Sequence, residues 1–154
     1  MLRSVANWPP LLARRLLAPL TLVLLGGCTE PTTTDFLTVR DATVRELLPG
    51  SANTAAYVEL HNPSDQPVRV IRATSSAVRS IEFHRTARRN NMMSMRRLEA
   101  IVVPAQGTLR LEPGGLHLML FGVTALPANV DIQLIFDDGR NQTIDFRRVA
   151  LGGN

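Results

Sequence analysis

Short runs in which apolar and polar residues alternate follow one another from residue 38 to the end of the chain. Examples are AAYVELHN at 55–62, VRSIEFH at 78–84 and LHLMLFGV at 116–123, with turn-forming stretches such as NPSDQP, PAQG, EPGG and DDGR between runs of this kind. We also predict one strand for RLEAIVV and one or two strands for FLTVRDATVREL. Successive side chains of a strand point to opposite faces, so these runs predict strands with one buried face. No segment keeps a helical period over three turns. About eight strands in about 115 residues predict a single all-β domain, a Greek-key β-sandwich or barrel.

The first 27 residues precede this pattern and have the composition of an export segment. Arg3, Arg14 and Arg15 are followed by LLAPLTLVLL, an apolar stretch of ten residues, and then by GGC. A helix that spans a bilayer needs about 20 apolar residues, so this stretch is too short to be one. We therefore predict a secretory signal peptide over residues 1–27.

The only cysteine of the chain, Cys28, stands at the end of the sequence LGGC. This sequence resembles the lipobox of bacterial lipoproteins, in which the cysteine is lipidated; an ordinary signal peptide with a chance cysteine is the alternative. We expect a lipidated Cys28 and polar tether over 28–37 and a domain over 38–150. The resemblance implies a lipid-anchored protein on the periplasmic side of the bacterial cell envelope. Thr29 replaces the aspartate that usually retains lipoproteins in the inner membrane, which favours the outer membrane.

Charge and composition exclude several classes of function. All 17 basic residues are arginines, and without the three in the signal peptide 14 remain against 13 acidic residues. So small an excess gives little support to nucleic-acid binding, and export argues further against it. The domain has no cysteine pair for a disulfide. No Ser-His-Asp arrangement, paired-carboxylate signature or phosphate-binding glycine loop is visible, so we expect no enzyme.

The methionines and histidines of the predicted domain cluster instead of scattering. Two stretches, FHRTARRNNMMSM and LHLM, hold all of its methionines and all but one of its histidines: His84, Met92, Met93, Met95, His117 and Met119. Methionine used only as core filler should be scattered. Thioether and imidazole together suit Cu(I) better than Ca²⁺, Mg²⁺ or structural zinc. A blue-copper site would need a cysteine thiolate, which the domain lacks.

The spacing His84-x10-Met95-x21-His117-x-Met119 is similar to the copper motif of the PCuAC family of periplasmic copper chaperones. The segments AAYVELHNPSDQPVRV, IVVPAQGTLRLEPGGLHLMLFGV and IFDDGRNQTIDFRRV also resemble that family, so the likeness covers roughly residues 38–149. It implies a cupredoxin-like Greek-key β-sandwich with these four residues as Cu(I) ligands. It also implies copper supply to cytochrome oxidase, notably to its Cu(A) centre.

Other residues near the motif are candidates for lesser roles. Met92 and Met93 are alternative ligands or a hydrophobic lid. His61 ends a run beside an Asn-Pro turn and is expected at the surface. Phe121 shares the predicted face of the second methionine ligand and is expected to shield the ion from water. Glu82 lies two residues before His84, so on a strand the two would share a face, and Glu82 is a candidate to orient this histidine.

The chain departs from the family pattern in the segment after the first histidine. Arg85 stands where the family usually has an acidic residue, and ARRNN replaces a stretch that usually carries Asp-Gly. Arg85, Arg88 and Arg89 therefore bring positive charge near a cation site. They are either a solvated face or a docking surface for an acidic partner. An aromatic residue that the family often has near Thr43 or Val44 is also absent.

Two hypotheses of function follow from these observations. The first is a lipid-anchored copper chaperone that holds Cu(I) and transfers it to another envelope protein, with the Cu(A) centre of cytochrome oxidase as the acceptor that the resemblance implies. The second is a structural or adhesive β-sandwich lipoprotein with a degenerate metal site, which the departure at Arg85 supports.

Overall fold

Ten β-strands and no helix make up the described part of the chain, residues 36–89 and 92–150 of the computed structural model. The predicted signal peptide, Cys28 and most of the predicted tether lie outside these residues. Within them, no helix long and apolar enough to cross a membrane occurs. The strands are β1 (Thr38–Arg45), β2 (Asn53–Asn62), β3 (Val68–Thr74), β4 (Ser80–Arg89), β5 (Met92–Leu98), β6 (Ile101–Val103), β7 (Gly107–Leu111), β8 (Leu116–Phe121), β9 (Asn129–Phe136) and β10 (Asn141–Val149).

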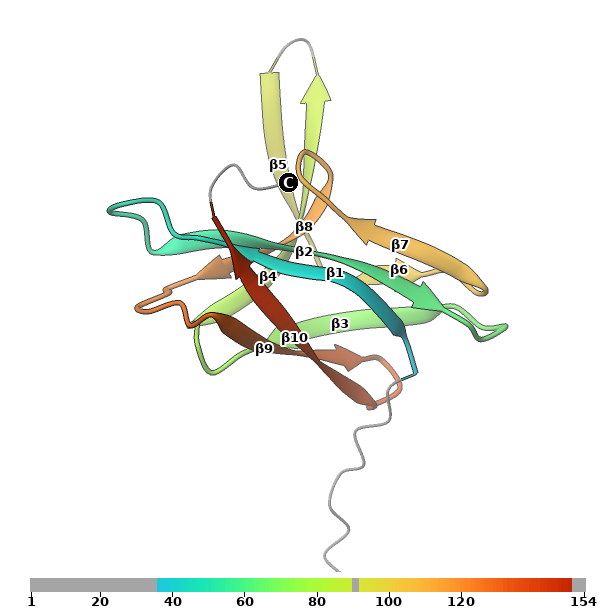
Figure 1. Ribbon diagram of the computed structural model, residues 1–154. Coiled ribbons are helices and arrows are strands. Elements are labelled where there is room, and N and C mark those ends of the chain that lie inside the picture. The colour runs from blue at the N-terminus through green and yellow to red at the C-terminus, as the bar shows by residue number, and fades with distance from the viewer. Residues whose placement is uncertain (1–35, 90–91, 151–154) are drawn as a thin grey trace, which may run out of the picture. The chain divides into compact units, whose positions relative to one another are not determined.

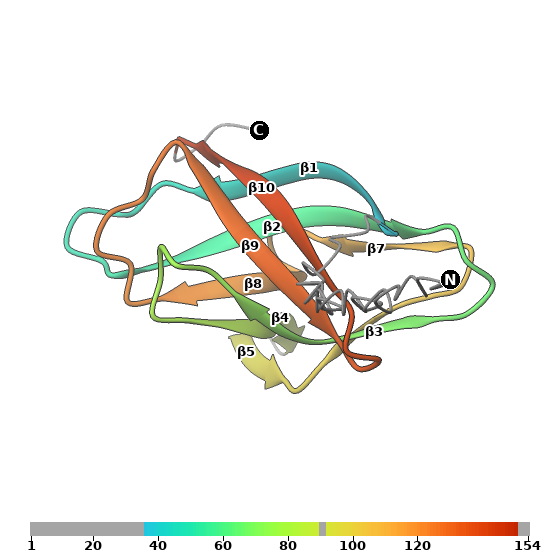
Figure 2. The same ribbon diagram turned by 90° about the horizontal axis from the view of Figure 1, so that it is seen from below.

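The strands are hydrogen-bonded into one sheet that folds over itself. Its order is β5-β4-β8-β2-β1-β10-β9-β3-β6, and β7 pairs with β2 beside this path. The pairing of β1 with β10 is parallel. In Figure 1, β1 and β2 lie above β3 and β9, and β10 runs diagonally between them, paired with β1 on one side and with β9 on the other; in Figure 2, β9 and β10 cross in front of β2 and β8. The predicted all-β sandwich is therefore confirmed.

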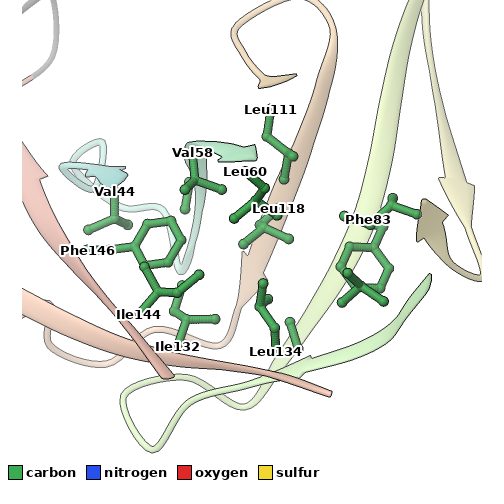
Figure 3. Packing of buried hydrophobic residues seen from close by; sticks show 14 of the residues in the cluster. Val44, Val58, Leu60, Phe83, Leu111, Leu118, Ile132, Leu134, Ile144 and Phe146 are labelled. Atoms are coloured by element: carbon green, nitrogen blue, oxygen red, sulfur yellow. The ribbon is translucent and has the colours of Figure 1, made fainter. Parts of the chain in front are cut away.

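The core lies between these two layers and is made by the inward residues of the alternating strands. Val58 and Leu60 of β2 and Leu118 of β8 face Ile132 of β9 and Phe146 of β10, as Figure 3 shows. All five side chains are at most 2% exposed. Burying an aliphatic or aromatic side chain of this size stabilises a fold by roughly 1.5–3 kcal/mol. The apolar residues at alternate positions of these strands therefore form the buried core that stabilises the fold.

Glycines mark both ends of β8, the strand that carries the HLM sequence. Gly114 has a φ of +78°, which favours glycine, in the turn before the strand. That turn is closed by the N–H of Gly115, which donates to the carbonyl of Glu112 at 3.1 Å. Gly122, with a φ of +67°, follows the strand, and a Cβ there would lie 2.7 Å from the Cβ of Arg79. The limits of β8 are therefore set by local backbone geometry.

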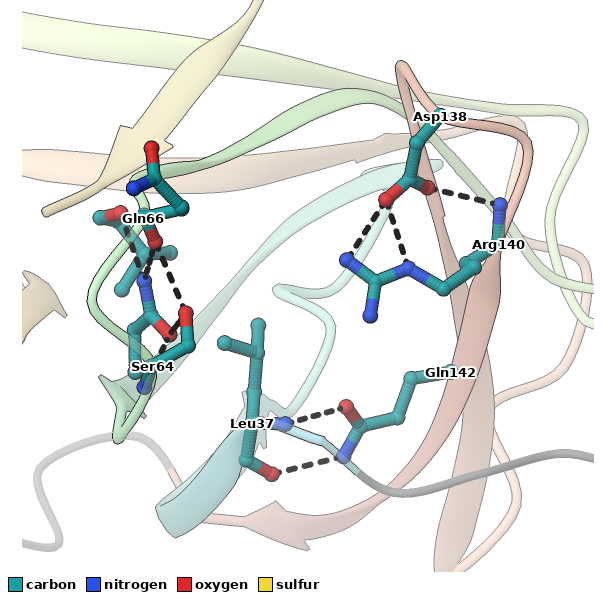
Figure 4. Close-up of polar contacts among 8 residues, drawn as sticks. Leu37, Ser64, Gln66, Asp138, Arg140 and Gln142 are labelled. Carbon is teal, nitrogen blue, oxygen red and sulfur yellow. Dashed lines mark hydrogen bonds and ion pairs between the residues drawn. The ribbon is translucent and has the colours of Figure 1, made fainter. Parts of the chain in front are cut away.

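Buried polar side chains close the turns and the N-terminal end of the domain (Figure 4). Asn62 is fully buried; its Oδ1 accepts from the N–H of Ser64 at 3.0 Å, and its Nδ2 donates to the carbonyl of Gln66 at 2.7 Å. Gln142 exchanges two hydrogen bonds with the backbone of Leu37, at 3.1 and 2.9 Å. Leu37, the last residue of the predicted tether, is thus fixed against β10.

One predicted strand is divided in the structure, and the open choice between one and two strands at the start of the domain is decided. The run RLEAIVV is predicted as one strand, but it is divided: β5 ends at Leu98 and β6 begins at Ile101, at opposite ends of the strand order. That prediction is wrong because alternation does not show which partner each half pairs with. The run FLTVRDATVREL forms one strand with a bulge, since the register shifts between Arg40 and Thr43 and Asp41 has a φ of +52°.

Candidate metal centre

The two faces of β8 have different chemistry. Its leucines point into the core, whereas His117 and Met119 occupy the opposite, outer face of the sheet. His117 is nevertheless only 4% exposed, and Met119 is partly buried. The two residues thus share one face of a strand, as the sequence predicts.

The neighbouring strand β4 brings the other candidate histidine to the same face. In the antiparallel pairing of β4 with β8, His84 lies directly opposite His117, and Glu82 lies opposite Met119. The two imidazole ring centroids are 6.0 Å apart. His84 and Met119 are diagonal neighbours in this pairing, a relation that places residues about 7–8 Å apart and within reach of long side chains.

Met95 reaches this face from β5. It pairs with Thr86, which lies two residues beyond His84 on β4 and therefore on the same face. β4 pairs with β8 only as far as Arg85, and the rest of β4 and β5 extends away from the layered strands in Figure 1. The Met95 side chain is 55% exposed. It therefore flanks the two histidines from the more accessible side.

Three of the four candidate ligands line a hollow of about 380 Å³. Met95, His117 and Met119 line it together with Tyr57 and Thr86, whereas His84 is not among its lining residues. A larger hollow of about 520 Å³ shares Tyr57 with it, over β1, β2 and β7. The larger hollow contains no thioether or imidazole, so the smaller one is the candidate site for a soft metal ion.

In each imidazole, one ring nitrogen takes part in a hydrogen bond and the other remains available. The Nδ1 of His117 lies 3.2 Å from the carbonyl oxygen of Gly115, which can only accept, so this nitrogen donates and Nε2 keeps the lone pair. The Nε2 of His84 donates to Oε2 of Glu82 at 2.8 Å. The Nδ1 of His84 is buried and has no hydrogen-bond partner among the described residues. Buried polar atoms without partners are rare, so this atom suits an additional ligand.

Three further side chains complete the surroundings of the histidines. Nη1 of Arg97 lies 3.3 Å from the second carboxylate oxygen of Glu82. The ring centroids of Phe121 and His84 are 6.1 Å apart, and those of Tyr57 and His117 are 6.5 Å apart. The shielding role of Phe121 stays a prediction. Sequence reasoning missed Tyr57, Thr86 and Arg97, because only the register between strands brings them to this face.

The donor set fits a soft, singly charged ion. Within residues 36–89 and 92–150, no three His, Cys, Asp or Glu side chains gather where they could hold a metal. A metal bound on this face would therefore depend on the thioethers of Met95 and Met119. Two imidazoles and two thioethers are neutral donors that suit Cu(I) and offer no oxygen ligands for a hard cation.

The remaining candidate ligands lie farther out. Met92 and Met93 are 72% and 70% exposed. Met93 pairs with Arg88 and so shares the face of Met95, whereas Met92 is on the opposite face. His61 is not brought to the group, since its Nδ1 lies 3.1 Å from the hydroxyl of Thr108 near the other end of β2.

The arginines that follow the first histidine lie on both faces of β4. Arg85 is exposed and lies on the face opposite His84, directly across from the exposed Arg96 of β5. Arg88 lies on the same face of β4 as His84. The side chain of Arg89 is outside the described residues. The departure at Arg85 therefore places its charge behind the candidate site and not within it.

Solved structures similar to this one include copper-bound proteins. The copper-bound PCuAC domain from PmoF2 matches with a TM-score of 0.64 and 25% identity, over 75% of this chain and 94% of that domain. The solution structure of Cu(I)-bound DR1885 from Deinococcus radiodurans matches with a TM-score of 0.60 and 31% identity, over 76% of this chain and 80% of that protein. These matches confirm the predicted cupredoxin-like β-sandwich.

Sequence comparisons identify a lipoprotein family. The family model described as "Putative lipoprotein LpqE-like" matches residues 37–147. The "Putative lipoprotein Lxx21020" of Leifsonia xyli subsp. xyli (strain CTCB07) is 36% identical over 99 residues, and the match covers 62% of this chain. The match spans 60% of the length of that curated relative.

Proposed function

Because the chain belongs to the LpqE-like lipoprotein family and shares its fold with copper-bound PCuAC domains, we propose that it binds Cu(I) in the cell envelope and passes it to another protein. The proposed ligands are His84, Met95, His117 and Met119. One observation carries the proposal: two imidazoles face each other across β4 and β8, and a thioether flanks them on each side.

The proposed selectivity follows from the softness of the donors. Thioether sulfur and imidazole nitrogen favour Cu(I) over Ca²⁺ and Mg²⁺, and neutral ligands leave the bound ion with a charge near +1. Thioethers do not form disulfides in an oxidising compartment, although they can be oxidised to sulfoxide. In the neutral imidazole of His117, donation from Nδ1 to the carbonyl of Gly115 leaves the lone pair on Nε2, which is then available to a metal ion.

The proposed transfer is a ligand exchange without electron transfer. Met95 is the most exposed of the four donors, at 55%, so we propose that an incoming thiolate of the acceptor replaces it first. Copper stays Cu(I) throughout, and the negative charge of the thiolate favours its movement to the acceptor. The Cu(A) centre of cytochrome oxidase is the acceptor that the likeness to PCuAC chaperones suggests.

We also propose that a lipid on Cys28 anchors the chain, after removal of residues 1–27, to the periplasmic side of the envelope, with the outer membrane favoured. Membership of a lipoprotein family supports this assignment. Replacing Cys28 with serine should release the protein into the soluble envelope fraction. Membrane fractionation of the Cys28→Ser variant tests it, and persistent membrane association would contradict it.

An anaerobic Cu(I) titration of the full chain against a competing chelator tests copper binding. We expect one Cu(I) per chain in the natural protein and none retained by the double variant His84→Ala, Met119→Ala. The copper-free double variant should remain folded, because these side chains lie outside the core. No retained copper in the natural protein would instead favour a structural or adhesive lipoprotein with a degenerate site.

A further inference from the structure

We propose that Glu82 is a positioning residue that makes His84 bind copper through Nδ1, whereas His117 binds through Nε2. This inference rests on the proposed function and adds to it the nitrogen that each histidine uses and the residue that fixes this choice.

The hydrogen bond between His84 and Glu82 determines which nitrogen of His84 carries the proton. A carboxylate has only acceptor oxygens, so Oε2 of Glu82, 2.8 Å from Nε2, requires a proton on Nε2. In the neutral imidazole the lone pair then resides on Nδ1. That atom is buried and has no hydrogen-bond partner among the described residues, so a second proton there would be an unsatisfied buried donor.

The carboxylate of Glu82 also contacts an arginine of the neighbouring strand. Arg97 of β5 lies directly opposite His84 in the register, and its Nη1 is 3.3 Å from Oε1 of Glu82. One carboxylate oxygen therefore accepts from His84 while the other faces Arg97. The contact with Arg97, whose side chain is 69% exposed, adds only a weak bias to the position of the carboxylate, and the imidazole cannot rotate without losing its hydrogen bond to Glu82.

The second histidine is oriented in the opposite sense. The carbonyl of Gly115 accepts from Nδ1 of His117, which leaves the lone pair on Nε2. Nδ1 is bonded to the ring carbon that joins the imidazole to the backbone, and Nε2 lies farther out. The two histidines therefore offer different ring nitrogens to a metal ion on the face they share.

A carboxylate that accepts a hydrogen bond from a ligating histidine is a frequent companion of protein metal sites. It fixes the tautomer and ring orientation and makes the ligating nitrogen more basic, and its removal typically weakens metal affinity 10–100-fold. Glu82 meets the geometric requirement of this role, whereas Gly115 supplies the equivalent acceptor for His117 from the backbone.

The tautomers can be measured in the copper-free protein. Long-range nitrogen–proton correlation spectra of the ¹⁵N-labelled full chain in detergent micelles should show His84 with its proton on Nε2 and His117 with its proton on Nδ1. Glu82→Gln should preserve the His84 tautomer, because the amide oxygen can accept the same hydrogen bond, and Glu82→Ala should produce a mixture. A proton on Nδ1 of His84 in the natural chain would overturn the inference.

Copper affinity provides the second readout, with Glu59 as a matched control. Glu59 is also a strand glutamate bonded to an arginine, Arg110, and its side chain is 21% exposed, compared with 26% for Glu82. Competition titrations with Cu(I) should give a 10–100-fold weaker affinity for Glu82→Ala, a smaller loss for Glu82→Gln and no change for Glu59→Ala.

The possible failures can be told apart. If the natural chain retains no Cu(I), the proposed function falls and the inference falls with it. If the natural chain binds Cu(I) and Glu82→Ala binds as tightly as Glu59→Ala, only the inference is overturned. Tighter binding by Glu82→Ala would also overturn it, because the carboxylate would then compete with copper for His84.

Discussion

The inner and outer faces of β8 differ in both burial and chemistry, although the residues of the two faces alternate along the same six-residue strand. The inner leucines at 116, 118 and 120 are 6%, 1% and 0% exposed and pack in the core. The outer face presents an imidazole and a thioether to a hollow. The inner face therefore stabilises the fold, and the outer face is available for binding. Substitutions on the two faces should have separable effects on unfolding and on copper affinity.

The largest expected effect on stability is at the inner face. Leu118→Ala should lower the free energy of unfolding by about 2–5 kcal/mol, because it removes buried methyl groups and leaves a cavity. Urea unfolding of the copper-free protein measures this change. A loss no greater than that of an outer-face substitution would contradict the division between the two faces.

The complementary change on the outer face should affect copper instead. Met119→Leu keeps the volume of the side chain, so the free energy of unfolding should fall by less than about 1.5 kcal/mol. It removes the thioether, and Cu(I) affinity should fall by at least about tenfold. Competition titration and urea unfolding of the same variant provide both values. Unchanged affinity would remove Met119 from the proposed ligand set.

The sequence predicts which residues of a strand share a face, but it does not predict which strands pair or which residues meet across them. Alternation in LHLMLF correctly separates the leucines from His117 and Met119, and the Pro-Gly-Gly turn correctly places the start of the strand. The division of RLEAIVV between β5 and β6 could not be predicted, because strand pairing depends on residues distant in sequence. For the same reason Thr86, Tyr57 and Arg97 were not expected at the candidate site.

A smaller effect distinguishes the two faces of the exposed strand β5. Met95 and Met92 are both exposed, at 55% and 72%, but only Met95 has the parity of Thr86 and His84. Met95→Leu should weaken Cu(I) binding by roughly tenfold, and Met92→Leu should leave it unchanged. Competition titrations of the two variants side by side decide this. An equal loss of Cu(I) affinity in both variants would mean that the face on which a methionine lies does not decide whether it binds copper.

The face of β4 and β5 behind the candidate site should influence transfer more than binding. Arg85 and Arg96 lie directly opposite each other, and like charges in this position destabilise a strand pair. Replacing both with glutamine should slow Cu(I) transfer to an acidic acceptor a few-fold and flatten its salt dependence, with affinity unchanged. Stopped-flow transfer at low and high salt measures this.

A matched variant controls for the loss of positive charge in that experiment. Arg69 and Arg147 are exposed on β3 and β10, far along the strand order from β5. Their double replacement by glutamine should leave the transfer rate unchanged. If it slows transfer as much as the change at Arg85 and Arg96, net charge and not a local surface governs docking.

The smallest expected effect is at the turn between β9 and β10, remote from both faces of β8. The backbone N–H and side chain of Arg140 hydrogen-bond to Asp138 and hold the pKa of this carboxyl below its usual value (Figure 4). A lowered folded-state pKa contributes stability above about pH 4, and this contribution is lost as the pH falls through the folded value. Asp138→Asn should therefore reduce the difference in unfolding midpoint between pH 6 and pH 3, without changing copper affinity.

X-ray absorption at the copper edge of the Cu(I)-loaded full chain tests the central claim most directly. Copper bound on the outer face by His84, Met95, His117 and Met119 should show two nitrogen and two sulfur neighbours. Met119→Leu should remove one sulfur and leave both nitrogens. A spectrum with only nitrogen or oxygen neighbours, or the same sulfur count in the Met119→Leu variant, would contradict the proposed site.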